Sequence, residues 1–375
     1  MNAKTMFGIL TSLVMLAGTA CGAADGTSAE ADTSVQEDTL SAKTFTADSS
    51  NVKLLGRDYL ADDGTLWVVH SASGVEFSFM GTKASVTIVG DSGAGTAQNS
   101  GNEARFAVYV NGKLTMDELV TEPEKTYEIF SSDAEAETVV RIIKLSESAN
   151  STFGIKSIDA ECTGGIQPTA PKDMKIEFIG DSITCGYGVL AEPTVTGYTT
   201  FEQDSTMAYA YMTAEKLNAS GRYEAISGQG ILCNCNGEKA LEITKFYRWT
   251  LRDETPWDFS LWTPDVVVVN AGTNDSWGGV DSAAFGAKAD EFLRELREVY
   301  PDALLIWAYG MMDVRFTDTL TAVVAALGDE RVRFLPLAPI DLKNGDVGGG
   351  GHPNVNASIR VSDLLAKTIK NELGW

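Results

Sequence analysis

Two residues far apart in this sequence are suited to nucleophilic chemistry. Gly180, Asp181 and Ser182 directly follow an apolar run, which predicts a strand that ends beside a serine hydroxyl. The chain has two histidines, and His352 is the one that follows a glycine run, at residues 348–351. A serine nucleophile needs a nearby base that accepts its proton. Ser182 and His352 are therefore predicted to act together, as nucleophile and base.

Two further groups are candidate donors for a developing oxyanion. Asn274 belongs to a Gly-Thr-Asn-Asp sequence that follows the predicted strand 265–270, and Gly228 belongs to a Ser-Gly-Gln-Gly sequence that follows the predicted strand 223–226. A side-chain amide and a backbone N–H can both stabilise an oxyanion. In an open parallel sheet the ligand site lies at the carboxyl ends of the strands, so we expect these residues near Ser182.

Each of these residues also has a simpler interpretation. Gly-Asp-Ser by itself is typical of an ordinary turn. His70 lies inside a predicted strand, where a structural role is expected. Cys185, three residues after Ser182, is a rival nucleophile, but a role as a small buried side chain is expected for it. The combination of Ser182 with His352 is what favours a functional site.

The elements that must position these residues change character along the chain. Short alternating runs predict β-strands, and Asn111-Gly112 predicts a hairpin turn because both positions favour positive φ. The predicted strands are 66–70, 75–79, 84–89, 106–110 and 139–145. They indicate an all-β sandwich over residues 50–163. After a stretch rich in glycine and proline, strands alternate with helical segments, which predicts an α/β domain with a mostly parallel sheet over residues 172–375.

The N-terminus is typical of an exported protein. Residues 1–21 resemble a bacterial lipoprotein signal, with Lys4 at the charged end, an apolar segment, and Cys21 as the residue that would be lipidated. An ordinary signal-peptidase site is the alternative. Residues 22–48 are small, polar and acidic, which predicts a disordered tether. We expect the protein to lie at the extracellular face of the membrane, where the lipid would be its only membrane contact. The alternative is that it is secreted.

Composition excludes several classes of partner. The formal net charge is −23 and no Lys/Arg cluster is present, which argues against nucleic acid. The two histidines and the Cys233-x-Cys235 pair do not form a zinc motif, and no phosphate-binding glycine loop occurs, so neither metal nor cofactor is expected. Export would permit disulfides among the four remaining cysteines, but the sequence does not decide their pairing. A monomer is expected.

The order of these sequence blocks resembles the SGNH (GDSL) hydrolase family. More narrowly, residues 180–188, 227–230 and 257–264 resemble carbohydrate esterase family 2, over about residues 50–375. This resemblance implies a jelly-roll-like sandwich followed by an SGNH domain with flavodoxin-like topology. It also implies removal of acetyl groups from plant polysaccharides, such as xylan and glucomannan, or from sugars.

The resemblance further implies roles for single residues. The oxyanion would be held by the N–H groups of Ser182 and Gly228 and by the Asn274 amide. Many SGNH enzymes have an aspartate three residues before the histidine, where this chain has Gly349. We therefore expect a Ser-His dyad with a backbone carbonyl orienting His352, and Asp346 is the alternative orienting group.

Other functions remain compatible with this sequence. An SGNH esterase acting on acylated peptidoglycan or lipid would share every catalytic residue, since these residues handle the acyl group rather than the alcohol. A surface carbohydrate-binding protein with an inactive hydrolase domain is the alternative from another class. Members of the family that this sequence resembles often have an aromatic residue directly before the histidine, where this chain has Gly351. The substrate preference is therefore left open. Four aromatic residues are candidates for stacking on sugar rings, although packing is the commoner role at such positions, namely Tyr187, Trp257, Trp262 and Trp277.

Overall fold

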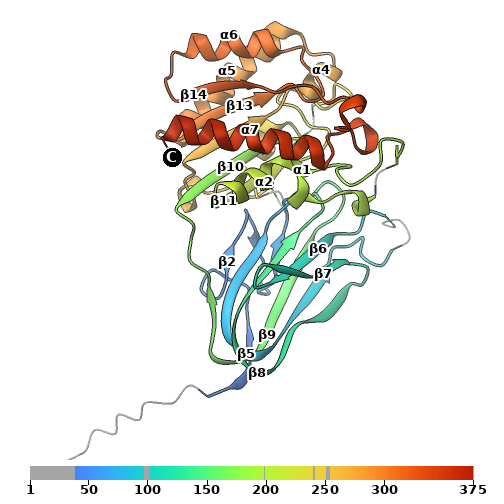
Figure 1. Ribbon diagram of the computed structural model, residues 1–375, viewed down its shortest axis with the longest axis vertical. Coiled ribbons are helices and arrows are strands. Elements are labelled where there is room, and N and C mark those ends of the chain that lie inside the picture. Colours follow the sequence, from blue (N-terminus) through green and yellow to red (C-terminus); the bar gives the residue numbers. More distant parts are fainter. Residues whose placement is uncertain (1–38, 97–100, 198, 240, 251–253, 375) are drawn as a thin grey trace, which may run out of the picture. The chain divides into compact units, whose positions relative to one another are not determined.

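The computed structural model describes residues 39–374, except residues 97–100, 198, 240 and 251–253. The first part of this range forms an antiparallel β-domain (Figure 1). Its strands are β1 (Ser41–Phe45), β2 (Lys53–Leu54), β3 (Tyr59–Leu60), β4 (Leu66–Val68), β5 (Gly74–Gly90), β6 (Arg105–Val110), β7 (Lys113–Leu119), β8 (Glu124–Lys144) and β9 (Phe153–Pro168). The predicted lipoprotein signal, with Cys21, lies outside the described residues. Within them, no helix combines the length and the apolar character that a membrane-spanning helix requires.

The β-domain is one hydrogen-bonded sheet that folds over its own apolar face. The main path through the sheet runs β3-β4-β9-β5-β8-β6-β7, so β5 and β8 separate β6 from β9. Nevertheless, the rings of Phe106 in β6 and Phe153 in β9 lie 5.5 Å apart. Neighbouring strands are about 4.8 Å apart, so a flat sheet would hold these rings much farther from each other. The Asn111-Gly112 hairpin is confirmed, and both residues have positive φ.

The structure places both ends of the β-domain beyond the predicted bounds. β1 lies inside the segment predicted to be a disordered tether, and it pairs with β9. The last strand, β9, continues to Pro168, past the predicted boundary at 163. Gly164 and Gly165 have positive φ at a register shift, after which Ile166 again pairs with β5. The glycines that indicated a linker therefore form an irregularity within a strand.

The second part of the chain is the predicted α/β domain. Its strands are β10 (Met174–Gly180), β11 (Ala219–Ala225), β12 (Val266–Asn270), β13 (Leu304–Tyr309) and β14 (Val332–Pro336). Its helices are α1 (Ser182–Cys185), α2 (Tyr209–Lys216), α3 (Ile243–Phe246), α4 (Thr273–Trp277), α5 (Ser282–Val299), α6 (Thr317–Leu327) and α7 (Val355–Leu373). Short 3₁₀ helices cover Thr200–Glu202, Ser205–Met207, Phe259–Leu261, Leu342–Asn344 and Gly349–Gly351.

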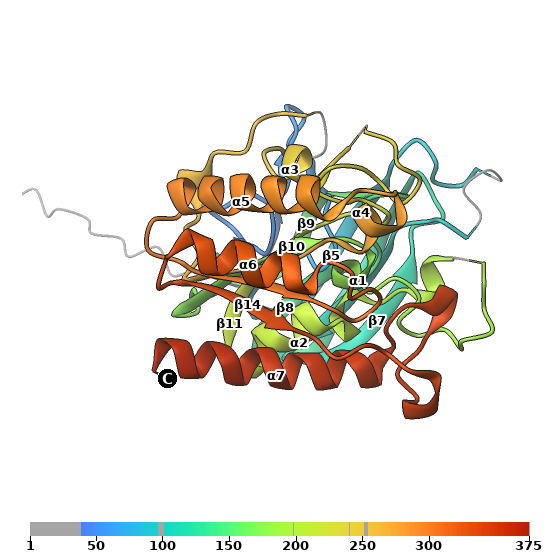
Figure 2. The ribbon, with the colours of Figure 1, turned by 90° about the horizontal axis from the view of Figure 1, so that it is seen from above.

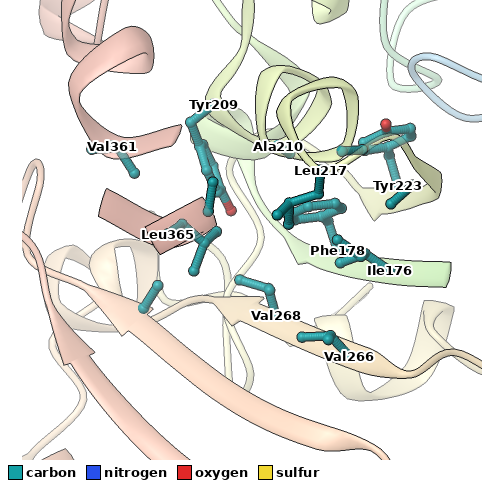
Figure 3. Close-up of a cluster of buried hydrophobic side chains, with 14 of the residues drawn as sticks. Ile176, Phe178, Tyr209, Ala210, Leu217, Tyr223, Val266, Val268, Val361 and Leu365 are labelled. Atoms are coloured by element: carbon teal, nitrogen blue, oxygen red, sulfur yellow. The ribbon is translucent and has the colours of Figure 1, made fainter. Parts of the chain in front are cut away.

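A parallel sheet lies between two layers of helices in this domain. The strand order is β11-β10-β12-β13-β14, and every pair is parallel. Side chains alternate across the sheet: Phe178 and Val268 contact α2 and α7, as Figure 3 shows, while Ile179 and Val269 belong to the apolar cluster of α5. Figure 2 shows α5 and α7 on opposite sides of the strands. This burial on both faces accounts for the uninterrupted apolar runs of β12 and β13.

The start of α7 lies just beyond the proline that follows His352. A proline there would suit a first helical position, but Pro353 instead forms an isolated bridge with Val347. Asn354 is the N-cap residue, and its side chain accepts hydrogen bonds from the N–H groups of Asn356 and Ala357. An asparagine at this position satisfies N–H groups that the helix itself cannot. His352 therefore lies in the loop that precedes the capped helix.

A buried charged cluster joins the two domains. Arg57, from the β2–β3 loop, donates to Glu177 of β10 over 2.7 Å and lies 3.2 Å from Glu224 of β11. His70, predicted to be structural, places Nε2 2.8 Å from Glu224 Oε2. These side chains are fully or almost fully buried. Buried ions need such partners, because they have lost their hydration. His70 thus contributes to the interface between the two domains.

Candidate active site

Ser182 lies at the carboxyl end of β10, the second strand of the sheet. The strand ends at Gly180, which is in register with Ala225 of β11 and Asn270 of β12. Asp181 then caps α1 by accepting a hydrogen bond from the Ile183 N–H over 3.0 Å. A Cβ at Gly180 would come within 2.2 Å of the Thr184 hydroxyl. Glycine at 180 therefore permits the tight turn that places Ser182 above the sheet edge.

His352 is in contact with Ser182. Its Nε2 lies 2.9 Å from Ser182 Oγ, and its Nδ1 lies 3.2 Å from the Gly350 carbonyl oxygen. A carbonyl oxygen can only accept a hydrogen bond, so this contact places the proton of neutral imidazole on Nδ1. Nε2 is then free to accept the hydroxyl proton of Ser182. The structure thus brings together the two residues predicted to be nucleophile and base.

The glycine run before His352 is required by its surroundings. Gly350 and Gly351 have φ of 60° and 76°, values that favour glycine. The Gly349 N–H donates to the Gly188 carbonyl over 2.9 Å. A Cβ at Gly349 would lie 2.6 Å from the Ala191 Cβ, which real side chains do not tolerate. The position that carries aspartate in many SGNH enzymes therefore has no space for a side chain here.

Asp346 is bound elsewhere. Its Oδ2 accepts a hydrogen bond from the Arg360 guanidinium over 2.7 Å, and its backbone carbonyl accepts one from the Asn354 N–H. No hydrogen bond joins Asp346 to His352 among the described residues. Asp346 thus anchors the loop to the start of α7, while the carbonyl of Gly350 faces the histidine.

Asn274 and Gly228 lie at the same edge as Ser182. The Asn274 amide donates to Asp181 Oδ2 over 3.0 Å and to the Gln229 carbonyl oxygen over 2.9 Å. These bonds tie together the sequence blocks that follow β10, β11 and β12. Gly228 has φ of 77°. No protein group in the described part of the chain accepts a hydrogen bond from the N–H of Ser182 or Gly228, so both remain available to a ligand.

Two aspartates that were not predicted as site residues, Asp181 and Asp275, hold this arrangement together. Asp181 is fully buried between α1 and the Asn274 amide, and burial raises its pKa to about 7. Asp275 accepts hydrogen bonds from three successive backbone N–H groups, of Ile231, Leu232 and Cys233. Both residues lie beside the predicted site residues in sequence, and that position was the only available signal.

The aromatic candidates separate into two groups. Trp257 and Trp262 pack against the buried Arg222 guanidinium, with its central carbon 5.0 Å and 4.6 Å from the ring centroids. Tyr187 lies against His352, with centroids 4.4 Å apart, and Trp277 ends α4 with 52% of its surface exposed. Tyr187 and Trp277 are therefore the two that lie on elements of the site.

The cysteines form no disulfide in the described part of the chain, and the rival nucleophile Cys185 is buried. Cys162, Cys185, Cys233 and Cys235 are free thiols. Cys185 is fully buried, and burial raises its pKa well above the ordinary value, so it is held as the weakly nucleophilic thiol. The residues that the structure describes contain no cluster of three His, Cys, Asp or Glu side chains suited to a metal ion.

A parallel sheet between two layers of helices, with a serine and a histidine in contact at the strand ends, is the arrangement expected of the SGNH hydrolases. Sequence comparison agrees with this class. Residues 178–357 match the GDSL-like lipase/acylhydrolase family, and residues 54–170 match the carbohydrate esterase 2 N-terminal domain. The chain belongs to carbohydrate esterase family 2 and is a carboxylic ester hydrolase.

Individual relatives cover most of this chain. A solved family two carbohydrate esterase from Clostridium thermocellum, in complex with cellohexaose, is 31% identical with a TM-score of 0.78, covering 86% of this chain and 99% of its own. The cellulase/esterase CelE of Acetivibrio thermocellus is 33% identical over 88% of this chain, which spans 41% of that relative's length. An acetylxylan esterase/glucomannan deacetylase of Cellvibrio japonicus is 25% identical over 78% of this chain and 79% of its own.

Proposed function

We propose that this protein removes O-acetyl groups from acetylated plant polysaccharides or sugars, such as xylan and glucomannan, through a Ser182-His352 dyad. The 2.9 Å contact between His352 Nε2 and Ser182 Oγ carries the proposal, together with the Gly350 carbonyl that faces Nδ1. The substrate class is supported by the Cellvibrio japonicus relative, which is named for these activities.

The acylation step follows from the contacts of Ser182. His352 Nε2 takes the hydroxyl proton while Oγ attacks the acetyl carbonyl carbon, and the carbonyl oxygen becomes an oxyanion. The free N–H groups of Ser182 and Gly228 donate to it. Asn274 supplies a third donor by exchanging its bond to the Gln229 carbonyl for one to the oxyanion. Collapse of this intermediate transfers the proton from His352 to the departing sugar oxygen.

Deacylation repeats the same proton transfers with water. His352 removes a proton from water, the resulting hydroxide attacks the acetyl-serine, and acetate leaves as Ser182 regains its proton. The Gly350 carbonyl holds the imidazole in one tautomer throughout. A carbonyl dipole stabilises the imidazolium less than a carboxylate does, which is the cost of a dyad relative to a triad.

The acid limb of the pH profile should reflect burial of the dyad. Burial lowers the pKa of His352 to about 4, although its hydrogen bonds to Gly350 and Gly349 oppose the shift. The base must be neutral, so we expect kcat/KM to fall as pH decreases through about 4 rather than through the ordinary histidine value near 6.5. Hydrolysis of 4-nitrophenyl acetate across this range, with circular dichroism to monitor folding, measures it. An acid limb at or above pH 6.5 contradicts this prediction.

Replacing Asn274 by alanine should impair turnover. Loss of one oxyanion donor typically lowers kcat on the order of 10²- to 10³-fold, and little change in KM is expected because the interaction forms in the transition state. Steady-state kinetics of Asn274→Ala measure both constants. Near-normal kcat in the folded variant would show that the amide serves only to hold Asp181 and the Gln229 carbonyl.

The substrate class is tested by acetate release. Wild-type protein should release acetate from acetylated xylan or glucomannan at least tenfold faster than from acetylated peptidoglycan, and it should not cleave long-chain lipid esters. Ser182→Ala provides the blank in each assay. Preference for peptidoglycan or lipid esters would leave the esterase assignment intact and refute the proposal that polysaccharides are the substrate. Binding to the polysaccharides without acetate release would favour a carbohydrate-binding protein.

We also propose that Cys21 is lipidated and holds the enzyme, as a monomer, at the extracellular face of the cell membrane. Support comes from the sequence alone, in which Cys21 directly follows three small residues at the end of an apolar segment. Expression of the full chain in a bacterial host tests the anchor. Membrane association that is lost in Cys21→Ala is the expected result, whereas equal release of both proteins into the medium would indicate ordinary secretion.

A further inference from the structure

The loop that follows β8 brings a carboxylate from the β-domain to the catalytic edge of the hydrolase domain. Glu147 is 1% exposed, and its carboxylate accepts hydrogen bonds from the Ser227 N–H over 2.8 Å and from the Ser227 hydroxyl over 2.5 Å. Ser227 directly precedes Gly228, whose N–H is a proposed oxyanion donor. The β-domain therefore contacts the catalytic machinery itself, through one buried side chain.

Other contacts fix Glu147 in this position. The Gln203 side chain accepts a hydrogen bond from the Glu147 N–H over 3.0 Å and donates to the Cys185 carbonyl oxygen over 3.1 Å. The Lys144 ammonium donates to the Glu147 carbonyl oxygen over 2.8 Å. The Cys185 thiol is a further hydrogen-bond partner of the carboxylate. Glu147 thus lies between α1, which carries the nucleophile, and the turn that carries Gly228.

We propose that Glu147 is a positioning residue, which fixes the Ser227–Gly228 peptide so that the Gly228 N–H points toward the oxyanion. This inference rests on the role of Gly228 in the proposed function. The direction of that N–H is set by rotation about the backbone of Ser227, and two hydrogen bonds to one carboxylate restrict this rotation. On the other side of the Gly228 Cα, the carbonyl of the next peptide accepts a hydrogen bond from the Cys235 N–H over 2.9 Å. Oxyanion donors act only when they are held in place before the reaction.

The chemistry of Glu147 matches this role. A carboxylate accepts two hydrogen bonds from Ser227 without offering a competing donor, whereas a glutamine amide would direct an NH₂ group at one of these donors. Burial raises the pKa of Glu147, and the bonds from Ser227 oppose this effect. Loss of the carboxylate should therefore alter the position of the Gly228 N–H and leave Ser182 and His352 in contact.

Glu147→Gln tests the proposal. We expect kcat for 4-nitrophenyl acetate to fall about 10- to 100-fold, less than for complete loss of a donor, with KM within about twofold of wild type. Glu76→Gln is the matched control. Glu76 is also a buried β-domain carboxylate, bound by Lys53 and Arg141, and it has no contact with the site. This control should lose thermal stability and retain kcat.

A double-mutant cycle separates positioning from general stability. Ser227→Ala removes one of the two bonds and should lower kcat about 3- to 10-fold, and its effect should be much smaller when Glu147→Gln is already present. If Glu147→Gln does not fold, the kcat of Ser227→Ala alone tests the inference. Normal kcat in folded Glu147→Gln, or in Ser227→Ala when only that variant folds, would overturn the inference. An equal loss of kcat in Glu76→Gln would also overturn it. Turnover by Ser182→Ala above about 1% of wild type would instead refute the proposed function.

Discussion

Ser182→Ala is expected to lose on the order of 10⁶ in kcat, the scale seen when a hydrolase loses its serine nucleophile. The Ser182 hydroxyl contacts His352 Nε2 at the carboxyl end of β10, and in the described part of the chain no other side chain bonds to this nitrogen. Cys185 is buried in the same short helix and held as a thiol, so it does not substitute. Measurement of acetate release from 4-nitrophenyl acetate over hours gives the residual rate.

The control for this variant is another buried serine of the same domain. Ser362 is fully buried in α7 and bonds to the backbone carbonyl of Ile359. Ser362→Ala should retain turnover within a few-fold, and both variants should melt within a few degrees of wild type because each loses one hydroxyl. Turnover by Ser182→Ala above about 1% of wild type would transfer the nucleophile to another residue.

His352→Ala should lose nearly as much activity as Ser182→Ala, because nucleophile and base act as a unit. The double variant should therefore be no slower than either single variant. Asp346→Asn should remain within about tenfold of wild type, since the Asp346 carboxylate is bound to Arg360 and the Gly350 carbonyl faces His352. Steady-state kinetics of these variants and of wild type measure kcat, and thermal melting checks that each variant is folded.

Arg360→Met controls for the ion pair. It removes the bond to the Asp346 carboxylate and leaves that carboxylate in place. A dyad predicts similar, small losses for Arg360→Met and Asp346→Asn. A loss on the order of 10⁴ confined to Asp346→Asn is the result expected of a triad aspartate, and it would overturn the dyad.

Local sequence patterns predicted much of the fold and of the candidate site. The alternation of apolar strands with helical segments predicted a mostly parallel sheet, and that sheet is confirmed. Ser182 and Asn274 follow neighbouring parallel strands, so their proximity required only the topology. His352 was predicted to be the base mainly by exclusion, because the other histidine of the sequence, His70, lies in a predicted strand.

The N-terminal boundary was predicted less well, for a physical reason. β1 contains small and polar residues, and its burial alternates weakly, as expected of a strand that depends on backbone bonds to β9. Such pairing depends on a partner more than a hundred residues away, and composition carries no signal for it. The same applies to the bulge in β9, where Gly164 and Gly165 resembled a linker.

The sequence by itself determined which residue types meet at the strand ends, because chain direction in a parallel sheet brings those ends together. Tertiary structure alone decided what surrounds them. The group that faces His352 Nδ1 is a backbone carbonyl, which every residue carries, so no residue type could reveal it. Glu147 reaches Ser227 from the other domain, across eighty positions, and only packing between the domains creates that contact. The pairing of Ser182 with His352 follows from local sequence and topology, whereas the orientation of the two side chains depends on long-range contacts.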